Sequence, residues 1–427
     1  MTVILLISLF LFMALLGIPI AVSLGMTSFL LLYFELKVPL TVMAQRMFSG
    51  VDSFPLMAIP FFVLAGAAMN TGGITRRIVD FSNSIIGQFR GGLALINILA
   101  SMFFGGVSGS AVADTSAVGG VLIPSMIKEK YERGFAAAVT AFSSGLGPII
   151  PPSITMVVYG IITGTSVSKL FVAGAIPGFL FGFGLLIFTY IIAVRRNYPR
   201  HDPVPLSVVW KTFLQVFWAL LMPVIIIGGI LSGIFTVTEA AAIAAIYSLF
   251  VGIVVFREIN SLAKIYQILA DSSVLVAAIM FLIAAAKLYS WLLVVAHVPQ
   301  IVTDFIFSLT KDPLMILMLV NVFMLIIGMF IEANAALIIF VPILFPVAMK
   351  VGIDPIHLGI VLVFNLCLGL VTPPVGLCLS LASQFAEVPL HRTFKAAIPF
   401  FIVGFGVLLL ITYLPQIVLI LPQMLFN

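Results

Sequence analysis

Two breaks rich in glycine and serine interrupt long apolar stretches of this sequence, and both carry side chains able to bind a ligand. The first covers residues 105–115 (GGVSGSAVADT) and the second residues 328–334 (GMFIEAN). Such backbone is tolerated at membrane depth only where it is buried in protein or lines a water-filled cavity. A half-helix that ends there leaves unpaired carbonyls, which suit Na⁺, and one that begins there leaves amides, which suit a carboxylate. The alternative for the first break is a small-residue face for close helix packing.

Each break also contains an acidic residue, Asp114 in the first and Glu332 in the second. An acid at this depth is a candidate ligand for a proton or a cation. It could equally cap the half-helix that leaves the break, where the helix dipole favours negative charge. The sequence leaves both roles open for both acids.

Two double prolines form a second pair of breaks, in residues 143–152 (SSGLGPIIPP) and 365–374 (NLCLGLVTPP). Proline lacks an amide hydrogen, so the prolines end the incoming helix, free the carbonyls before them and are well placed to begin the next half-helix. The hydroxyls of Ser153, Thr155 and Thr372 can add side-chain oxygens. A simple kink needs one proline, so a double proline used twice indicates a binding site.

All four breaks belong to an internal repeat with a constant offset of 222 residues. Four of the five prolines in residues 102–179 find a proline at that offset, which means far more than apolar matches in a chain that is 63% hydrophobic. The matching pairs are Met102/Met324, Gly106/Gly328, Pro124/Pro346, Lys128/Lys350, Gly147/Gly369, Pro151/Pro373, Pro152/Pro374 and Pro177/Pro399. Glu332 stands opposite Ser110 in this register. Broken helices at matching places in two halves indicate a secondary transporter.

The composition predicts a polytopic α-helical membrane protein. Charged residues make up 8% of the 427 residues, and the mean hydropathy is +1.30. This excludes a soluble enzyme, and the continuous apolar runs do not fit a β-barrel. Without a Walker motif or histidines at metal-ligand spacing, we expect no ATP hydrolysis and no enzymatic cofactor. The excess of five positive charges fits the inner-leaflet rim of a membrane protein and not a nucleic-acid surface.

The apolar stretches are the expected membrane spans. They cover residues 2–34, 54–71, 93–124, 135–163, 170–194, 213–233, 236–256, 274–296, 313–348, 356–385 and 398–425. The first could be one tilted helix or two helices broken near Pro19. Residues 93–124 and 313–348 are too long and too polar in the middle for one crossing, which predicts re-entrant helical hairpins. Residues 135–163 and 356–385 are predicted to be broken helices.

The distribution of Lys and Arg supports this arrangement. With both hairpins re-entrant, fourteen basic residues fall on one side of the bilayer and five on the other. The larger set comprises Arg76, Arg77, Arg90, Lys128, Lys130, Arg133, Arg195, Arg196, Arg200, Lys211, Arg257, Lys264, Arg392 and Lys395. The positive-inside rule makes that side, with the linker 195–212, cytoplasmic. Five crossings separate 54–71 from 274–296, so the second repeat is predicted to be inverted relative to the first.

The sequence resembles the large membrane subunit of tripartite ATP-independent periplasmic (TRAP) transporters over essentially its whole length. The resemblance depends on residues 109–115 (GSAVADT), 147–153 (GPIIPPS), 233–242 (GIFTVTEAAA) and 369–376 (GLVTPPVG). It implies the ion-transporter superfamily fold, with a scaffold and a transport domain that moves as an elevator. It also implies Na⁺-driven import of an organic acid across the bacterial inner membrane.

The family's two Na⁺ sites, carried over by motif, lie at each hairpin tip with the neighbouring broken helix. One set would be Gly106, Ser108, Gly147 and Pro151, and the other Gly328, Gly369 and Thr372. The residues expected to face the substrate are Ser108, Ser110, Asp114, Thr155 and Glu332. Ser108 belongs to both groups.

The resemblance also implies partners and a division into domains. We expect a periplasmic substrate-binding protein, and a small four-helix membrane subunit that forms a separate chain because nothing precedes Met1 here. The expected domains are N-terminal scaffold helices (1–53), a first repeat (54–194), a cytoplasmic linker (195–212), further scaffold helices (213–273) and a second repeat (274–427).

Three alternative functions remain at this stage. A stand-alone Na⁺/dicarboxylate symporter of the same fold would need no soluble partner. An intramembrane enzyme could use Asp114 and Glu332 as an acid pair, although inverted hairpins would place them in segments that open to opposite sides. A channel is disfavoured because no ring-forming filter segment is present. The identity of the acid, whether sialic acid, a C4-dicarboxylate or a keto or sugar acid, cannot be read from the sequence.

Overall fold

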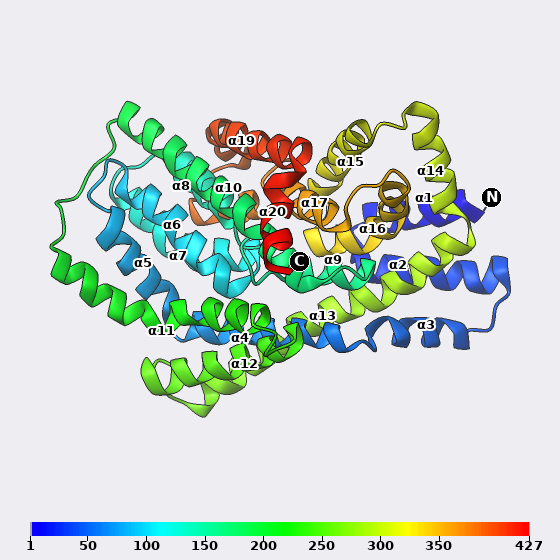
Figure 1. Ribbon diagram of the computed structural model, residues 1–427, viewed down its shortest axis with the longest axis horizontal. Coiled ribbons are helices and arrows are strands. Elements are labelled where there is room, and N and C mark those ends of the chain that lie inside the picture. The colour runs from blue at the N-terminus through cyan, green and yellow to red at the C-terminus, as the bar shows by residue number, and fades with distance from the viewer. Residues whose placement is uncertain (1, 427) are drawn as a thin grey trace.

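The computed structural model describes residues 2–426, and all the regular elements in that range are helices (Figure 1). The first half contains α1 (Thr2–Leu15), α2 (Ile20–Leu30), α3 (Thr41–Val51), α4 (Ala58–Thr71), α5 (Ile74–Ile86), α6 (Gly92–Ser108), α7 (Ala111–Lys128), α8 (Arg133–Ser144), α9 (Ile154–Thr163) and α10 (Val167–Arg195). The second half contains α11 (Leu206–Leu231), α12 (Val237–Phe250), α13 (Leu262–Val295), α14 (Val298–Leu309), α15 (Pro313–Gly328), α16 (Ala333–Lys350), α17 (Pro355–Gly369), α18 (Leu377–Phe385), α19 (Leu390–Tyr413) and α20 (Pro415–Phe426). Short π- or 3₁₀-helical turns are η1 (Leu31–Leu36), η2 (Phe54–Met57) and η3 (Val251–Val255).

The expected multi-span helical protein is confirmed. Among the described residues, seven helices are long and apolar enough to cross a membrane, or eight if the bent pair α14 and α15 counts as one span. The seven are η2 with α4, then α10, α11, α12 with η3, α13, α16 and α19. Their exposed surfaces are apolar, which is the pattern of helices that face lipid.

Each predicted break falls between two helices. The hairpin predicted over 93–124 is the pair α6 and α7, and that over 313–348 is the pair α15 and α16; in both, the two helices pack against each other. The broken helices predicted over 135–163 and 356–385 are α8 with α9 and α17 with α18. The first apolar stretch is two helices, because α1 ends before Gly17 and α2 begins after Pro19.

Elements with equivalent positions in the repeat correspond well beyond the motifs. Adding 222 to the bounds of α7 gives residues 333–350, the bounds of α16. The same offset relates α5 to α14, α8 to α17 and α10 to α19 within a few residues. One difference is that α13 is continuous where the matching α3 and α4 are interrupted at Asp52. The expected boundary between residues 273 and 274 therefore lies inside a single helix.

The two halves interlock. The outgoing helix of each hairpin packs against the far half of the other repeat's broken helix, so that α7 contacts α18 and α16 contacts α9. The helices outside the hairpins cross over in the same way, because α4 contacts α12 and α2 contacts α13. Neither half could form its hydrophobic core alone, and the breaks of both repeats are brought to the centre of one body.

Buried polar networks join each hairpin to its broken helix. In the first half, Asn97 donates to the Thr140 hydroxyl at 2.6 Å and accepts from the Ser143 hydroxyl at 2.9 Å. In the second half, Asn365 donates to the side chain of Asn321 at 3.0 Å and Asn321 donates to the Thr412 hydroxyl at 2.9 Å. Because unmade hydrogen bonds are costly in an apolar interior, these networks fix how each hairpin docks.

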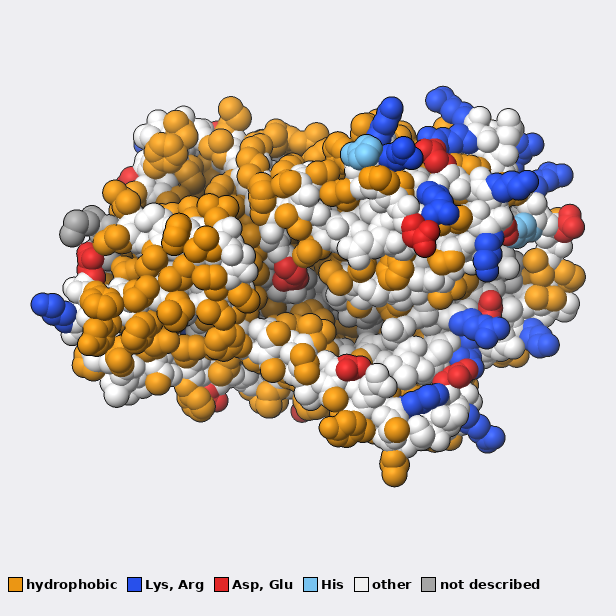
Figure 2. Space-filling model, turned by 180° about the vertical axis from the view of Figure 1, so that it is seen from behind, with side chains coloured by type: hydrophobic (Ala, Val, Ile, Leu, Met, Phe, Trp, Pro, Cys, Tyr) orange, Lys and Arg blue, Asp and Glu red, His pale blue; other side chains and the backbone are white. Residues whose placement is uncertain are grey.

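Lys and Arg side chains gather at one end of the molecule (Figure 2). Ion pairs at the helix ends there join segments far apart in sequence: Arg133 with Glu387, and Arg196 with Glu132. The segment after α10 joins the same end, since His201 lies 3.1 Å from Glu129. This gathering agrees with the basic side that the sequence predicted to be cytoplasmic.

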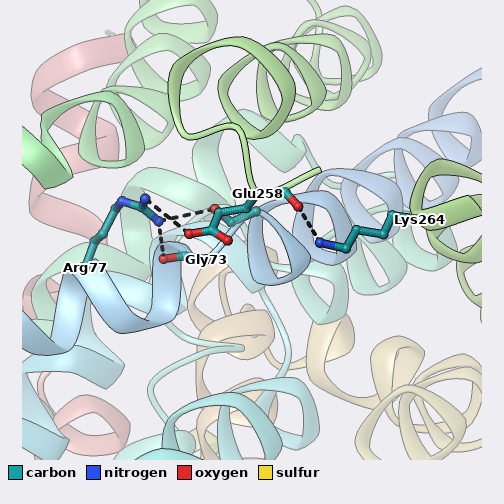
Figure 3. Close-up of polar contacts among 5 residues, drawn as sticks. Gly73, Arg77, Glu258 and Lys264 are labelled. Atoms are coloured by element: carbon teal, nitrogen blue, oxygen red, sulfur yellow. Dashed lines mark hydrogen bonds and ion pairs between the residues drawn. The ribbon is translucent and has the colours of Figure 1, made fainter. Parts of the chain in front are cut away.

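The turn from α4 into α5 is tied to the segment between α12 and α13 (Figure 3). Arg77 on α5 donates to the Gly73 carbonyl at 2.8 Å, and its guanidinium lies 3.4 Å from the Glu258 carboxylate. Lys264 donates to the Glu258 backbone carbonyl at 2.6 Å, and the Arg77 guanidinium lies 4.0 Å from the centre of the Phe256 ring. This cluster holds the first turn of α5 against the neighbouring helices.

Candidate functional site

A cavity of about 560 Å³ lies where the tips of the two hairpins meet. It is lined by Val63, Gly66, Ala67 and Asn70 of α4, Phe104 and residues 108–113 and 116 of the first hairpin, Pro148, Ile154 and Thr155 of the first broken helix, Asp271, Ser272, Leu275, Ala278, Ile279 and Leu282 of α13, and Glu332, Ala333, Asn334 and Leu370 of the second half. The size suits a small organic molecule. Four of the five residues expected to face a substrate line this cavity: Ser108, Ser110, Thr155 and Glu332.

The first hairpin presents the start of α7 to the cavity. Ser110 is the N-cap residue of α7, and its hydroxyl accepts from the Ala113 amide at 3.4 Å. Gly109 has φ +61°, and a Cβ there would lie 2.6 Å from the Pro152 carbonyl oxygen, so only glycine allows the tip this close to the broken helix. The amide end of α7 is thus held at the cavity behind a neutral cap.

The first broken helix presents a second amide end, that of α9. The Ser153 hydroxyl donates to the Pro148 carbonyl at 2.5 Å and accepts from the Met156 amide at 3.2 Å. This bonding closes the turn at the cis Pro151–Pro152 bond and places Thr155 in the cavity wall. Like Ser110, Ser153 is a neutral cap.

The second hairpin differs because its cap is charged. Glu332 is the N-cap residue of α16 and accepts from the amides of Asn334 at 2.9 Å and Ala335 at 3.2 Å. The Asn334 side chain donates a third hydrogen bond to Glu332 at 2.8 Å. The capping role that the sequence left open for Glu332 is therefore present, and the same residue also lines the cavity.

Asp114 is placed differently from the expectation that it faces the substrate. It is fully buried, is absent from the cavity lining, and neither carboxylate oxygen has a hydrogen-bond partner. The hydroxyls of Ser101 on α6 and Ser144 on α8 lie nearest to it. Asp114 therefore sits inside the junction of hairpin and broken helix, behind the cavity.

The glycines expected to border Na⁺ sites mark very close backbone approaches. A Cβ on Gly147 would lie 3.0 Å from the Ser110 carbonyl oxygen, and one on Gly106 would lie 3.6 Å from the Pro151 carbonyl oxygen. In the second half, a Cβ on Gly369 would lie 2.6 Å from the Cα of Gly328. Thr372 follows nearby and donates to the Leu368 carbonyl at 2.6 Å. Each half thus brings its predicted set together at one junction.

The far wall of the cavity was not predicted from the sequence. It consists of α4 and α13, which contribute Asn70, Asp271 and Ser272 among apolar residues. Asp271 is exposed, and no hydrogen bond or ion pair joins it to another described residue. A lone acid within an apolar span was the available signal, but nothing in the spacing related it to the hairpins.

Residues 6–417 match the family model described as the DctM component of the tripartite ATP-independent periplasmic transporter. The chain belongs to this family. It is 39% identical over 408 residues to the sialic acid TRAP transporter large permease protein SiaM of Vibrio cholerae, covering 96% of this chain and 95% of that protein. It is 43% identical over 381 residues to the C4-dicarboxylate TRAP transporter large permease protein DctM of Pseudomonas aeruginosa, covering 89% of each.

Membership in the DctM family confirms several predictions. The DctM chain is a multi-pass protein of the bacterial inner membrane and a transport permease, so the intramembrane-enzyme alternative is excluded. As one component of a tripartite periplasmic transporter, it acts together with other components.

The fold of this DctM chain also resembles a solved structure with a different sequence. The YdaH transporter of Alcanivorax borkumensis superimposes with a TM-score of 0.64 at 13% identity, covering 88% of each chain. At this identity the likeness shows the fold alone. It establishes that the arrangement of helices is one adopted by another transporter.

Proposed function

We propose that this DctM chain imports an organic acid by Na⁺-coupled symport, with the acid delivered by a periplasmic binding protein. The observation that carries the proposal is the cavity in which the hairpin tips of both halves meet the start of α9. Helix N-termini attract anions, and those of α7 and α9 carry neutral caps. The relatives named for sialic acid and for C4-dicarboxylates support a carboxylate as the transported molecule.

Two Na⁺ sites fit the two junctions of hairpin and broken helix. Na⁺ prefers oxygen ligands, and backbone carbonyls become available where helices end. Gly106, Ser108, Gly147 and Pro151 would hold one ion, and Gly328, Gly369 and Thr372 the other. The approach distances at Gly147 and Gly369 support this reading, because the glycines let two backbones come close enough to share a ligand. A bound ion would supply positive charge that helps to dock the hairpin tip.

Asp114 adds support for a cation in the first junction. A buried carboxylate without hydrogen-bond partners is unfavourable unless a cation or a proton neutralises it. Asp114 begins the second turn of α7, close to Ser110 and the Gly147 backbone. Its charge would therefore favour a cation bound at that junction.

An elevator movement is the mechanism that we propose, with the ion-transporter superfamily arrangement predicted above. The interlocked hairpins and broken helices would form the moving body, and α1 to α4 with α11 to α13 the scaffold. α5 and α14 connect the two, and both begin at a residue with left-handed backbone, Gly73 and His297. Inverted repeats allow two related states, each open to one side.

The tripartite assembly is proposed to include two further chains, a small four-helix membrane subunit and the periplasmic binding protein. The test is uptake of labelled organic acids into proteoliposomes that hold this chain and its small subunit. Uptake should require both a Na⁺ gradient and the binding protein. Uptake with Na⁺ alone would instead support a stand-alone symporter, and uptake without Na⁺ would contradict coupling.

A further inference from the structure

The cavity is strongly asymmetric in charge. One pole is formed by α7 and α9, whose N-termini attract negative charge and whose caps, Ser110 and Ser153, are uncharged. No Lys, Arg or His is among the described residues that line the cavity. This pole is therefore the place at which a carboxylate group would be stabilised, and it has room for one such group.

The opposite pole offers only hydrogen-bond acceptors. Glu332 receives three N–H donors and no O–H donor, which is the pattern of an ionised carboxylate. It also cancels the positive end of α16, so this half-helix attracts no anion. Asn334 uses its side-chain amide on Glu332, and its Oδ1 has no hydrogen-bond partner. Groups that approach this pole must donate hydrogen bonds.

The far wall adds a second acid. Asp271 lies on α13 in the lining, is exposed, and forms no recorded bond with other described residues. The lining thus contains two acids and no base. A second substrate carboxylate placed away from α7 and α9 would face Glu332 and Asp271, and like charges at short range in a cavity cost several-fold in affinity.

Building on the proposed function, we infer that the transported molecule is a monocarboxylate whose other end carries hydroxyl or ammonium donors. Its carboxylate lies at the starts of α7 and α9, and its hydroxyls donate to Glu332, Asn334 and Asp271. Glu332 and Asp271 are therefore specificity residues that discriminate against dicarboxylates. A hydroxylated sugar acid meets this requirement, and a C4-dicarboxylate does not.

The test measures binding directly to the purified complex of this chain and its small subunit, in Na⁺, by calorimetry. The probes are D-gluconate and N-acetylneuraminate as hydroxylated monocarboxylates, succinate as a dicarboxylate, and butyrate as a monocarboxylate without donors. We expect at least one hydroxylated acid to bind about tenfold or more tightly than succinate and butyrate. Direct binding keeps the selectivity of the periplasmic protein out of the result.

Two variants and a matched control complete the test. Asp271→Asn and Glu332→Gln should each strengthen succinate binding relative to the hydroxylated acid by about tenfold, while Asp304→Asn, an exposed acid on α14 outside the cavity, should change nothing. Asp271→Asn keeps the test usable if loss of the α16 cap prevents folding of Glu332→Gln. Equal or tighter succinate binding to the unmodified protein would overturn the inference while leaving acid transport intact. Absence of binding by every acid, together with no Na⁺-driven uptake, would instead contradict the proposed function.

Discussion

Ser110 and Glu332 occupy equivalent positions 222 residues apart, and both are N-cap residues of the outgoing helix of a hairpin. The serine accepts one backbone amide at 3.4 Å, whereas the glutamate accepts two at 2.9 and 3.2 Å and brings a negative charge. The same backbone design thus presents an anion-attracting helix end in one half and an anionic acceptor in the other. A nearly symmetric scaffold holds an asymmetric cavity.

Glycine at the two junctions can be tested by adding one methyl group. Gly147→Ala and Gly369→Ala should reduce Na⁺-dependent uptake by about tenfold or more, because the new Cβ would lie 3.0 Å and 2.6 Å from the opposing backbone and overpacking costs about 1–3 kcal/mol. Uptake into proteoliposomes is the measurement. Gly120→Ala is the matched control, since a Cβ there meets nothing within 4 Å. Normal uptake by both junction variants would show that close approach is unnecessary.

Asp114 can be tested through the Na⁺ dependence of uptake. Asp114→Asn keeps the shape of the side chain but removes the charge, so the Na⁺ concentration at half-maximal uptake should rise about tenfold. Ser108→Ala should act in the same direction, because it removes an oxygen from the same junction. Glu129→Gln is the control, as its carboxylate lies near His201, beyond the far end of α7. An unchanged Na⁺ requirement in Asp114→Asn would place the coupling ion elsewhere.

Ser153 is expected to hold the broken helix in shape. Ser153→Ala removes the hydroxyl that donates to Pro148 and caps α9, leaving a buried carbonyl and an amide unpaired. The expected cost is about 1–3 kcal/mol, visible as a lower unfolding temperature of the purified protein. Ser153→Thr keeps the hydroxyl and should recover most of the loss. Equal stability of the alanine variant would indicate that water replaces the hydroxyl.

The cluster at the start of α5 should contribute modestly to stability. The ion pair of Arg77 and Glu258 is partly exposed, with 23% and 50% of the two side chains accessible, so its coupling energy should be about 0.2–1 kcal/mol and fall with salt. A double-mutant cycle of Arg77→Gln and Glu258→Gln measured by thermal unfolding gives that energy. The Lys264 bond to the Glu258 backbone carbonyl persists in both variants and keeps the loop comparable. A coupling above this range would show that Glu258 is less well solvated than its exposure indicates.

The breaks and the repeat could be predicted from the sequence because their causes are local. Proline removes amide hydrogens and glycine admits close backbone contact wherever they occur, so the offset of 222 residues already locates the hairpins and the broken helices. The interruption between α1 and α2 at Gly17 and Pro19 follows the same logic. The continuity of α13 does not, since nothing local distinguishes it from α3 and α4.

The faces of the helices, in contrast, were decided by packing. Val112 and Ser116 line the cavity, and Asp114, midway between them, points to the opposite side of α7 because a helix turns about 100° per residue. Its motif gave no phase for the helix relative to the cavity. Asp271 joined the site only because α13 packs across the hairpin tips.

The sequence by itself determined that this is a membrane permease of the DctM family with two matched sets of broken helices, because apolar length, proline, glycine and the repeat are written along the chain. Only the tertiary structure decided which polar groups share the cavity. The positions of Glu332, Asp271 and the starts of α7 and α9 relative to one another depend on contacts between helices more than a hundred residues apart, which no local pattern specifies.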